Sequence, residues 1–240
     1  MKKDRTGLVF GVTTLLLLGV SPASAQTAAP SWWITVGAGG QLTKHEKAST
    51  VEFPVYDETA SLTWNHKVGA GLLVDVSGAY RIGIAGLAVG AGFSWFRNTA
   101  TTAVTASIPD PLVFDTHAAS TTSAKLTQQE KNIHVDVVYT FHINDKLDLA
   151  ASGGPAFYRV SRGVLTGANI PEGTQNATPT TGKQKLSATG GMVGFDASYL
   201  LSKRIRVLGF ARFAAANTKN PAGQLIRVGG LQVGGAFRIQ

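Results

Sequence analysis

The sequence predicts an all-β protein, an eight-stranded antiparallel up-and-down transmembrane β-barrel with short periplasmic turns and long extracellular loops. Three observations favour this fold. From residue 32 onward, eight stretches alternate apolar and polar residues with a period of two, as strands do and helices do not. Short and long connections alternate strictly between these stretches. Beyond residue 25, no run of about eighteen consecutive apolar residues suggests a transmembrane helix.

Residues 1–25 have the features of a cleaved secretory signal peptide. A basic start precedes an apolar run over 8–20, and Ala23-Ser24-Ala25 supplies a small-residue cleavage site. The run is too short to cross a bilayer of about 30 Å as a helix, which disfavours a membrane anchor. Cleavage would leave 26–31 as a periplasmic segment and 32–240 as the barrel. Losing three of 22 basic and one of 14 acidic residues lowers the formal net charge from +8 to +6.

The composition excludes several other classes of protein. Cysteine is absent, so disulfides cannot stabilise an exported chain and hydrogen-bonded structure must do so. The 28 glycines lack the three-residue period of collagen. Charged residues make up only 15% and hydrophobic residues 44%, which argues against disorder. Strands with one face of very small residues would explain the abundant glycine.

The alternation predicts eight strands, at 32–48, 60–80, 84–106, 124–143, 147–165, 184–201, 205–217 and 225–239. Three connections are tight, at 81–83, 144–146 and 202–204. The four longer connections, at 49–59, 107–123, 166–183 and 218–224, collect the turn-forming and polar residues. In barrels of this type the tight turns face the periplasm. Both termini are therefore expected there, with the long loops outside the cell.

The fourth strand shows most clearly which face meets lipid. Large apolar residues alternate with mostly polar ones: Ile133, Val135, Val137, Tyr139, Phe141 and Ile143 against His134, Asp136, Val138, Thr140 and His142. In the third and eighth strands the second face is mostly glycine and alanine, and in the sixth it is Gly194, Asp196 and Ser198. A soluble barrel would bury its apolar face. The second faces combine small residues with charges, and such faces could not form the packed core of a soluble barrel. A charge at mid-bilayer costs roughly 2–4 kcal/mol, so the charged faces should point away from lipid. The apolar face is therefore predicted to point outward.

Strand number, loop alternation and the closing stretch at 228–240 resemble the small outer-membrane β-barrel family that includes OmpA and OmpX. The resemblance covers 32–240. The closing stretch is similar to the terminal signal read by the barrel-insertion machinery. Its sequence is Val228-Gly229-Gly230-Leu231-Gln232-Val233-Gly234-Gly235-Ala236-Phe237-Arg238-Ile239-Gln240. It differs in ending on glutamine, with its aromatic residue three places earlier. The resemblance implies a bacterial outer-membrane location and that machinery as a partner during assembly.

The inward faces predict a plugged lumen. Large inward residues of the seventh strand are expected to lie across from small ones of the third: Arg206, Leu208, Phe210 and Arg212 against Gly86, Ala88, Gly90 and Gly92. Inward charges have both signs. They are interpreted as a polar network of ion pairs, because an unpaired buried charge costs several kcal/mol: Asp75, Asp136, Asp148, Asp196, Arg206, Arg212 and Arg238. A proton or ion path is the alternative.

Basic residues gather toward the predicted outer ends of the strands. The candidate rim consists of Lys67, Arg97, Lys131, Arg159, Arg162, Lys185 and Arg227. Such charges favour contact with anionic lipid, so outer-membrane lipid and lipopolysaccharide are the expected partners. An ordinary solvated rim is the alternative. Nucleic acid is not expected as a partner despite the basic composition, because the export signal removes the chain from the cytoplasm.

No motif identifies a reaction, a cofactor or a metal site. His134 and His142 would lie roughly 26 Å apart along one strand and cannot share an ion. A lipid-modifying enzyme would need a serine, a histidine and an acid near the membrane edge, for which Ser94, Ser161, His134 and Asp136 are the candidates. The predicted function is a monomeric, non-enzymatic barrel acting in envelope integrity or surface interaction through its loops. A narrow channel and a lipid-modifying enzyme are the alternatives.

Overall fold

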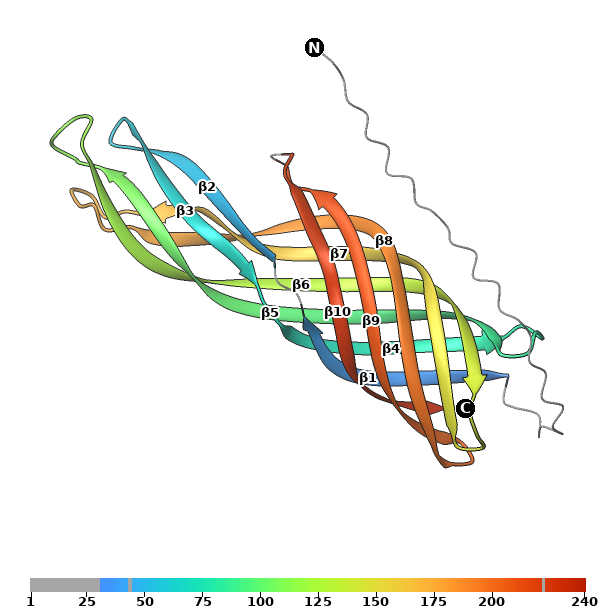
Figure 1. The fold of residues 1–240 in the computed structure, drawn as a ribbon. Helices are drawn as coiled ribbons and strands as arrows, with labels where there is room; N and C mark the ends of the chain where they lie inside the picture. The colour runs from blue at the N-terminus through green and yellow to red at the C-terminus, as the bar shows by residue number, and fades with distance from the viewer. Residues whose placement is uncertain (1–30, 43–44, 222) are drawn as a thin grey trace, which may run out of the picture.

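The computed structural model describes residues 31–42, 45–221 and 223–240. The predicted signal peptide, and 26–30 of the segment after it, lie outside these residues. The described chain forms ten strands, all paired antiparallel (Figure 1). They are β1 (Trp32–Leu42), β2 (His45–Val55), β3 (Glu58–Val68), β4 (Gly71–Arg81), β5 (Leu87–Pro109), β6 (His117–His142), β7 (Leu147–Asn169), β8 (Thr178–Ser202), β9 (Ile205–Lys219) and β10 (Leu225–Ile239). Among these residues no helix has the length and apolar character needed to span a bilayer.

Eight strands close into a ring in the order β1, β4, β5, β6, β7, β8, β9, β10. The seam between β1 and β10 runs from the pair Ile34–Ile239 to the pair Leu42–Leu231. A closed ring pairs the backbone groups of every strand, which a lipid environment requires. The predicted eight-stranded antiparallel barrel is therefore confirmed.

The two ends of the ring differ. At one end lie the tight turns β4–β5, β6–β7 and β8–β9, together with the start of β1 and the end of β10 (Figure 1). We call this the short-turn end. At the opposite end β5, β6, β7 and β8 run far beyond the ring as strands of 23 to 26 residues. We call this the long-strand end.

The predicted loop at 49–59 is wrong, because most of it is strand. The predicted strands 32–48 and 60–80 are each broken, and their outer parts form the hairpin β2–β3. Its turn is Tyr56-Asp57, where both residues have positive φ, of 50° and 60°. Two central residues of that conformation match the twist of a two-residue hairpin. The hairpin attaches to β5 through the pairs Ser61–Ser107 to Trp64–Val104.

The predicted loops at 107–123 and 166–183 are also mostly strand, leaving connections only at 110–116 and 170–177. The pairing of β6 with β7 reaches no farther out than Gln128–Arg162, whereas β5–β6 and β7–β8 stay paired beyond it. The strands therefore part into two layers, which we call the extension. Its apolar core consists of Ala60, Leu62, Trp64, Val104, Ala106, Ile108, Ala124, Leu126 and Leu165.

Below the extension, the side chains follow the predicted orientation. The outward residues Val135, Val137 and Phe195 are 42%, 55% and 69% exposed. Their neighbours His134 and Asp136 are buried inside the ring. An apolar exterior around a polar interior reverses the arrangement of a soluble barrel and suits a lipid environment. The fold is that of a small outer-membrane β-barrel.

Small residues make room for large ones on neighbouring strands. A Cβ on Gly92 of β5 would lie 2.4 Å from Nε2 of His134 on β6. A Cβ on Gly194 of β8 would lie 2.7 Å from Cγ of Arg212 on β9. At these positions the large residue covers the glycine of the neighbouring strand. The sequence analysis expected large residues to face small ones on the opposite strand, and at these positions that expectation is wrong. The reason is the strong tilt of barrel strands, which carries long side chains sideways.

Candidate functional site

Three arginine–aspartate pairs lie inside the lumen. They are Arg206–Asp148 at 2.7 Å, Arg212–Asp75 at 3.0 Å and Arg238–Asp196 at 3.3 Å between the closest nitrogen and oxygen atoms. All six residues are at most 9% exposed. Each pair joins two strands that are not hydrogen-bonded neighbours in the ring. The structure thus brings together six of the seven residues proposed for the lumen network.

The seventh residue, Asp136, contacts His134, with Nε2 and Oδ2 3.3 Å apart. Two further contacts extend the pairs. The hydroxyl of Ser94 donates to Asp75 at 2.7 Å, and Nδ1 of His142 lies 2.7 Å from Oδ1 of Asp148. The lumen charges therefore have polar partners from the short-turn end to the middle of the ring.

Trp33 is a lumen residue that the sequence analysis did not single out. Its ring lies under two guanidinium groups, 5.6 Å from Arg81 and 5.3 Å from Arg238. Cation–π contacts of this kind strengthen when they are shielded from water. The signal was present in the sequence, because Trp33 has the same alternation parity as the inward Thr35.

A second polar layer lies nearer the long-strand end, around Glu130. This carboxylate is only 2% exposed and accepts hydrogen bonds from Gln41 at 3.1 Å, from the backbone N–H of Gly229 at 3.1 Å and from Gln128. Gln232 in turn donates to Gln41 at 2.9 Å. Sequence analysis missed this layer, although Glu130 lies on the same strand face as His134.

Two members of the predicted basic rim lie elsewhere. Arg162 is only 6% exposed and shares the inward face of β7 with Tyr158 and Val160, so its assignment to the rim is wrong. Lys67 lies on the β2–β3 hairpin and pairs with Glu46 at 3.1 Å. The other five rim residues are exposed on outward faces: Arg97, Lys131, Arg159, Lys185 and Arg227.

Four of these residues belong to a continuous patch, which we call the cationic wall. It covers the outward face of β5, β6, β7 and β8 and consists of Arg97, Lys125, Lys131, Arg159, Lys183 and Lys185. Two grooves of about 520 Å³ each lie in the wall. One is lined by Arg97, Lys125 and Lys183, the other by Lys131, Arg159 and Lys185, and Gln129 and Ser161 line both.

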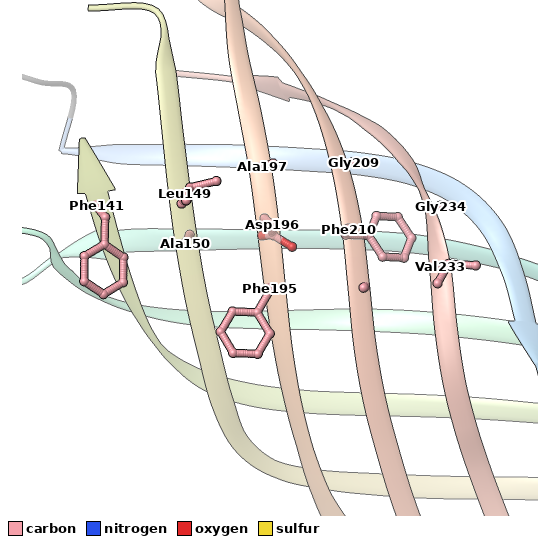
Figure 2. Close-up of a pocket in the computed structure, with 11 residues that line it drawn as sticks. Phe141, Leu149, Ala150, Phe195, Asp196, Ala197, Gly209, Phe210, Val233 and Gly234 are labelled. Atoms are coloured by element: carbon pink, nitrogen blue, oxygen red, sulfur yellow. The ribbon is translucent and has the colours of Figure 1, made fainter. Parts of the chain in front are cut away.

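An apolar hollow of about 580 Å³ lies on another part of the ring, over β6 to β10. Figure 2 shows Phe141, Phe195 and Val233 around it. The hollow forms where Ala197 of β8 is paired with Gly209 of β9, because residues this small leave the space between the larger side chains unfilled. Such a surface accommodates hydrocarbon chains and carries no chemistry of its own.

The four residues considered for catalysis lie in two places, and the hydroxyl of Ser94 donates to Asp75 rather than to His134. Ser94, His134 and Asp136 are buried in the lumen, whereas Ser161 lies on the outer wall. A nucleophile, a base and an orienting acid must lie within hydrogen-bonding reach of one another and of substrate. Among the described residues, no group of three or more acidic, histidine or cysteine side chains is placed to hold a metal ion.

No protein-family model matches the sequence, and no curated protein matches it. Several solved structures are similar over most of their length. Neisserial surface protein A aligns with a TM-score of 0.44 and 11% identity, over 88% of this chain and 97% of that one. The attachment invasion locus protein Ail of Yersinia pestis, solved with the heparin analogue sucrose octasulfate, gives 0.41 and 12%, over 87% and 97%. The outer-membrane protease OmpT of Escherichia coli gives 0.39 and 10%, over 89% and 97%.

Proposed function

We propose that this protein is a non-enzymatic outer-membrane β-barrel with a closed lumen, acting through the surface of its long-strand end. The observation that carries the proposal is the set of three buried arginine–aspartate pairs inside the lumen, each between strands that are not neighbours in the ring. Buried side chains paired inside the lumen in this way occupy space through which a solute would pass. The layer around Glu130 adds a second obstruction nearer the long-strand end.

Planar-bilayer conductance tests the closed lumen. The purified protein should give no reproducible single-channel steps, whereas a general porin added to the same bilayer should give them. Stable steps of one size from this protein would favour the narrow channel and overturn the proposal. A heat-dependent shift in SDS electrophoresis should accompany the measurement, since it reports that the barrel was folded.

The surface proposal rests on an exposed apolar turn at the tip of β5–β6. Leu112, Val113 and Phe114 are 91%, 55% and 80% exposed. The turn is ordered by Asp110, whose Oδ1 accepts the N–H groups of Leu112 at 2.8 Å and Val113 at 3.1 Å. Large apolar side chains held out in solvent by a built turn favour contact with another molecule.

The three tips of the extension are tied together. The hydroxyl of Tyr56 donates to the carbonyl of Thr174 at 3.1 Å, and Gln175 donates to Asp110 at 3.4 Å. The N–H of Asp115 donates to Glu58 at 3.3 Å. Since these bonds link three connections distant in sequence, the tips form one preorganised surface, which lowers the entropy lost on binding.

An epitope-labelling experiment tests the proposed orientation. A short tag inserted between Val113 and Phe114 should bind antibody on intact cells. The matched control carries the tag between Lys203 and Arg204, in the β8–β9 turn of the short-turn end. It should bind antibody only after the outer membrane is permeabilised. The reverse pattern would place the extension in the periplasm and remove the surface function.

A further inference from the structure

We infer that the cationic wall binds a lipid carrying two phosphate groups, one in each groove. The wall offers two cavities of equal volume, about 520 Å³ each, and three cations line each of them. The grooves adjoin, since Gln129 and Ser161 line both. Two anionic groups on one headgroup would therefore fit the arrangement better than one.

None of the six cations has an ion-pair partner among the described residues, in contrast to the paired arginines of the lumen. The outward positions between them are neutral, for example Thr127, Gln129 and Ser161. Six like charges on one face repel one another unless an anion lies among them. The wall is thus electrostatically complementary to a ligand with several negative charges.

The first groove lies where β6 and β7 part. Their pairing ends at Gln128–Arg162, and the groove is lined by the next outward residues, Thr127 and Gly163. A Cβ on Gly163 would lie 3.1 Å from the backbone nitrogen of Thr127, so glycine permits this close approach. The first groove therefore lies at the point where the extension branches from the ring.

A third hollow indicates a lipid as the source of the phosphates. It has a volume of about 370 Å³ and is lined by Val74, Val76, Phe93, Trp95 and Lys131. Lys131 also lines the second cationic groove. An apolar surface hollow with a cation at its edge suits a molecule whose phosphate lies next to an acyl chain. Free phosphate or pyrophosphate would leave this hollow unused.

The position of the wall agrees with this assignment. On β5 the outward residues change from Phe93 and Trp95 to Arg97 and Thr99, that is, from apolar to cationic and polar. On β6 the outward Ile133 is followed by Lys131 in the same direction. The cations thus stand where the apolar band ends, at the depth of a lipid headgroup. The inference rests on the proposed membrane location, and the two are tested separately.

Native mass spectrometry of the full barrel in detergent tests the inference, with diphosphoryl lipid A, monophosphoryl lipid A and inorganic pyrophosphate as probes. Wild-type protein should bind the diphosphoryl lipid at least about tenfold more tightly than the monophosphoryl lipid. Pyrophosphate should compete poorly. Equal affinity for the two lipids would overturn the two-phosphate assignment, and efficient competition by pyrophosphate would overturn the lipid assignment.

Two triple variants and a matched control locate the site. R97Q/K125Q/K183Q and K131Q/R159Q/K185Q should each reduce binding of the diphosphoryl lipid by about tenfold or more and abolish the preference over the monophosphoryl lipid. K203Q/R204Q/R227Q removes the same charge outside the wall and should change binding less than about twofold. Equal losses of lipid binding in all three variants would show that net charge alone determines the affinity, and would overturn the assignment to the wall. Heat-dependent electrophoretic migration verifies that each variant is folded, and it does not depend on lipid binding or on orientation in cells.

Discussion

The four long strands β5 to β8 run through both the ring and the extension, yet the two regions are organised in opposite ways. In the ring, β5 turns Ser94 inward and leaves Phe93 exposed. In the extension the same strand buries Val104 and Ala106 and exposes Thr105. The parity of the alternation is unchanged along the strand, but the chemistry of the two faces is exchanged.

The exchange shows that the surroundings of a strand, and not its backbone, decide what each face contains. Lipid around the ring demands an apolar exterior, so polar groups must collect and pair inside. Water around the extension reverses the preference, and the two layers bury an apolar core as a soluble sandwich does. The position along each strand where the apolar face changes sides therefore indicates where the membrane boundary lies.

The largest effect should come from breaking the polar core of the ring. Arg212→Ala leaves the buried carboxylate of Asp75 without its 3.0 Å partner, which should lower the free energy of unfolding by about 3–5 kcal/mol. Urea unfolding in lipid vesicles measures the loss. The double variant D75N/R212Q should recover a large part of it, because no lone charge remains. If the single and double variants lose equally, packing rather than pairing is responsible.

A charge on the apolar exterior should have the next largest effect. Val137 is outward and 55% exposed within the ring, so Val137→Arg should cost about 2–4 kcal/mol in vesicles. Thr105→Arg is the control, since Thr105 is outward and exposed in the extension and is paired with the neutral Thr121. It should change stability by less than about 0.5 kcal/mol. A similar cost at both positions would mean that the boundary between lipid and water does not lie between them.

The smallest of the three effects should come from the apolar core of the extension. Leu62 is fully buried there. Leu62→Ala should lower the free energy of unfolding by about 2 kcal/mol, which is at the lower end for such changes. The reason is that the β2–β3 hairpin lies at the edge of the sheet and can shift into the space left by the side chain. Proteolysis of the extension should become faster. Heat-dependent migration of the ring should not change, and its loss would show that the two regions unfold as one unit.

Much of the ring was predictable because alternation fixes which face a residue occupies. Once the apolar face was assigned to lipid, Asp75, Asp196 and Arg212 had to point inward. Their pairing was not predictable, because it depends on the tilt and stagger of the strands, which a sequence pattern does not give. The outward direction of Arg97 and Lys131 followed from the same parity. Arg162 was misplaced because proximity to the strand end was weighted above its inward parity.

The extension was missed for a different reason. Its strands are rich in threonine and serine and contain Pro54, which are features of loops as well as of exposed strand faces. The alternation nevertheless continues in Val51, Phe53 and Val55, and these side chains pack against the extension's core. Reading the period of two through the polar segments would have found the hairpin. The contact of the three tips could not have been found, since its bonds join residues 57 to 118 positions apart.

The seam between β1 and β10 has a consequence for biogenesis. Gln41 and Gln232 meet beside it although 191 positions separate them along the chain. The ring can close only after all the strands between β1 and β10 have been synthesised. Folding is therefore expected to be slow and cooperative. Until that moment both terminal strands expose unsatisfied edges that invite pairing with other chains. Shielding of these two edges until the ring closes is therefore expected to limit pairing with other chains.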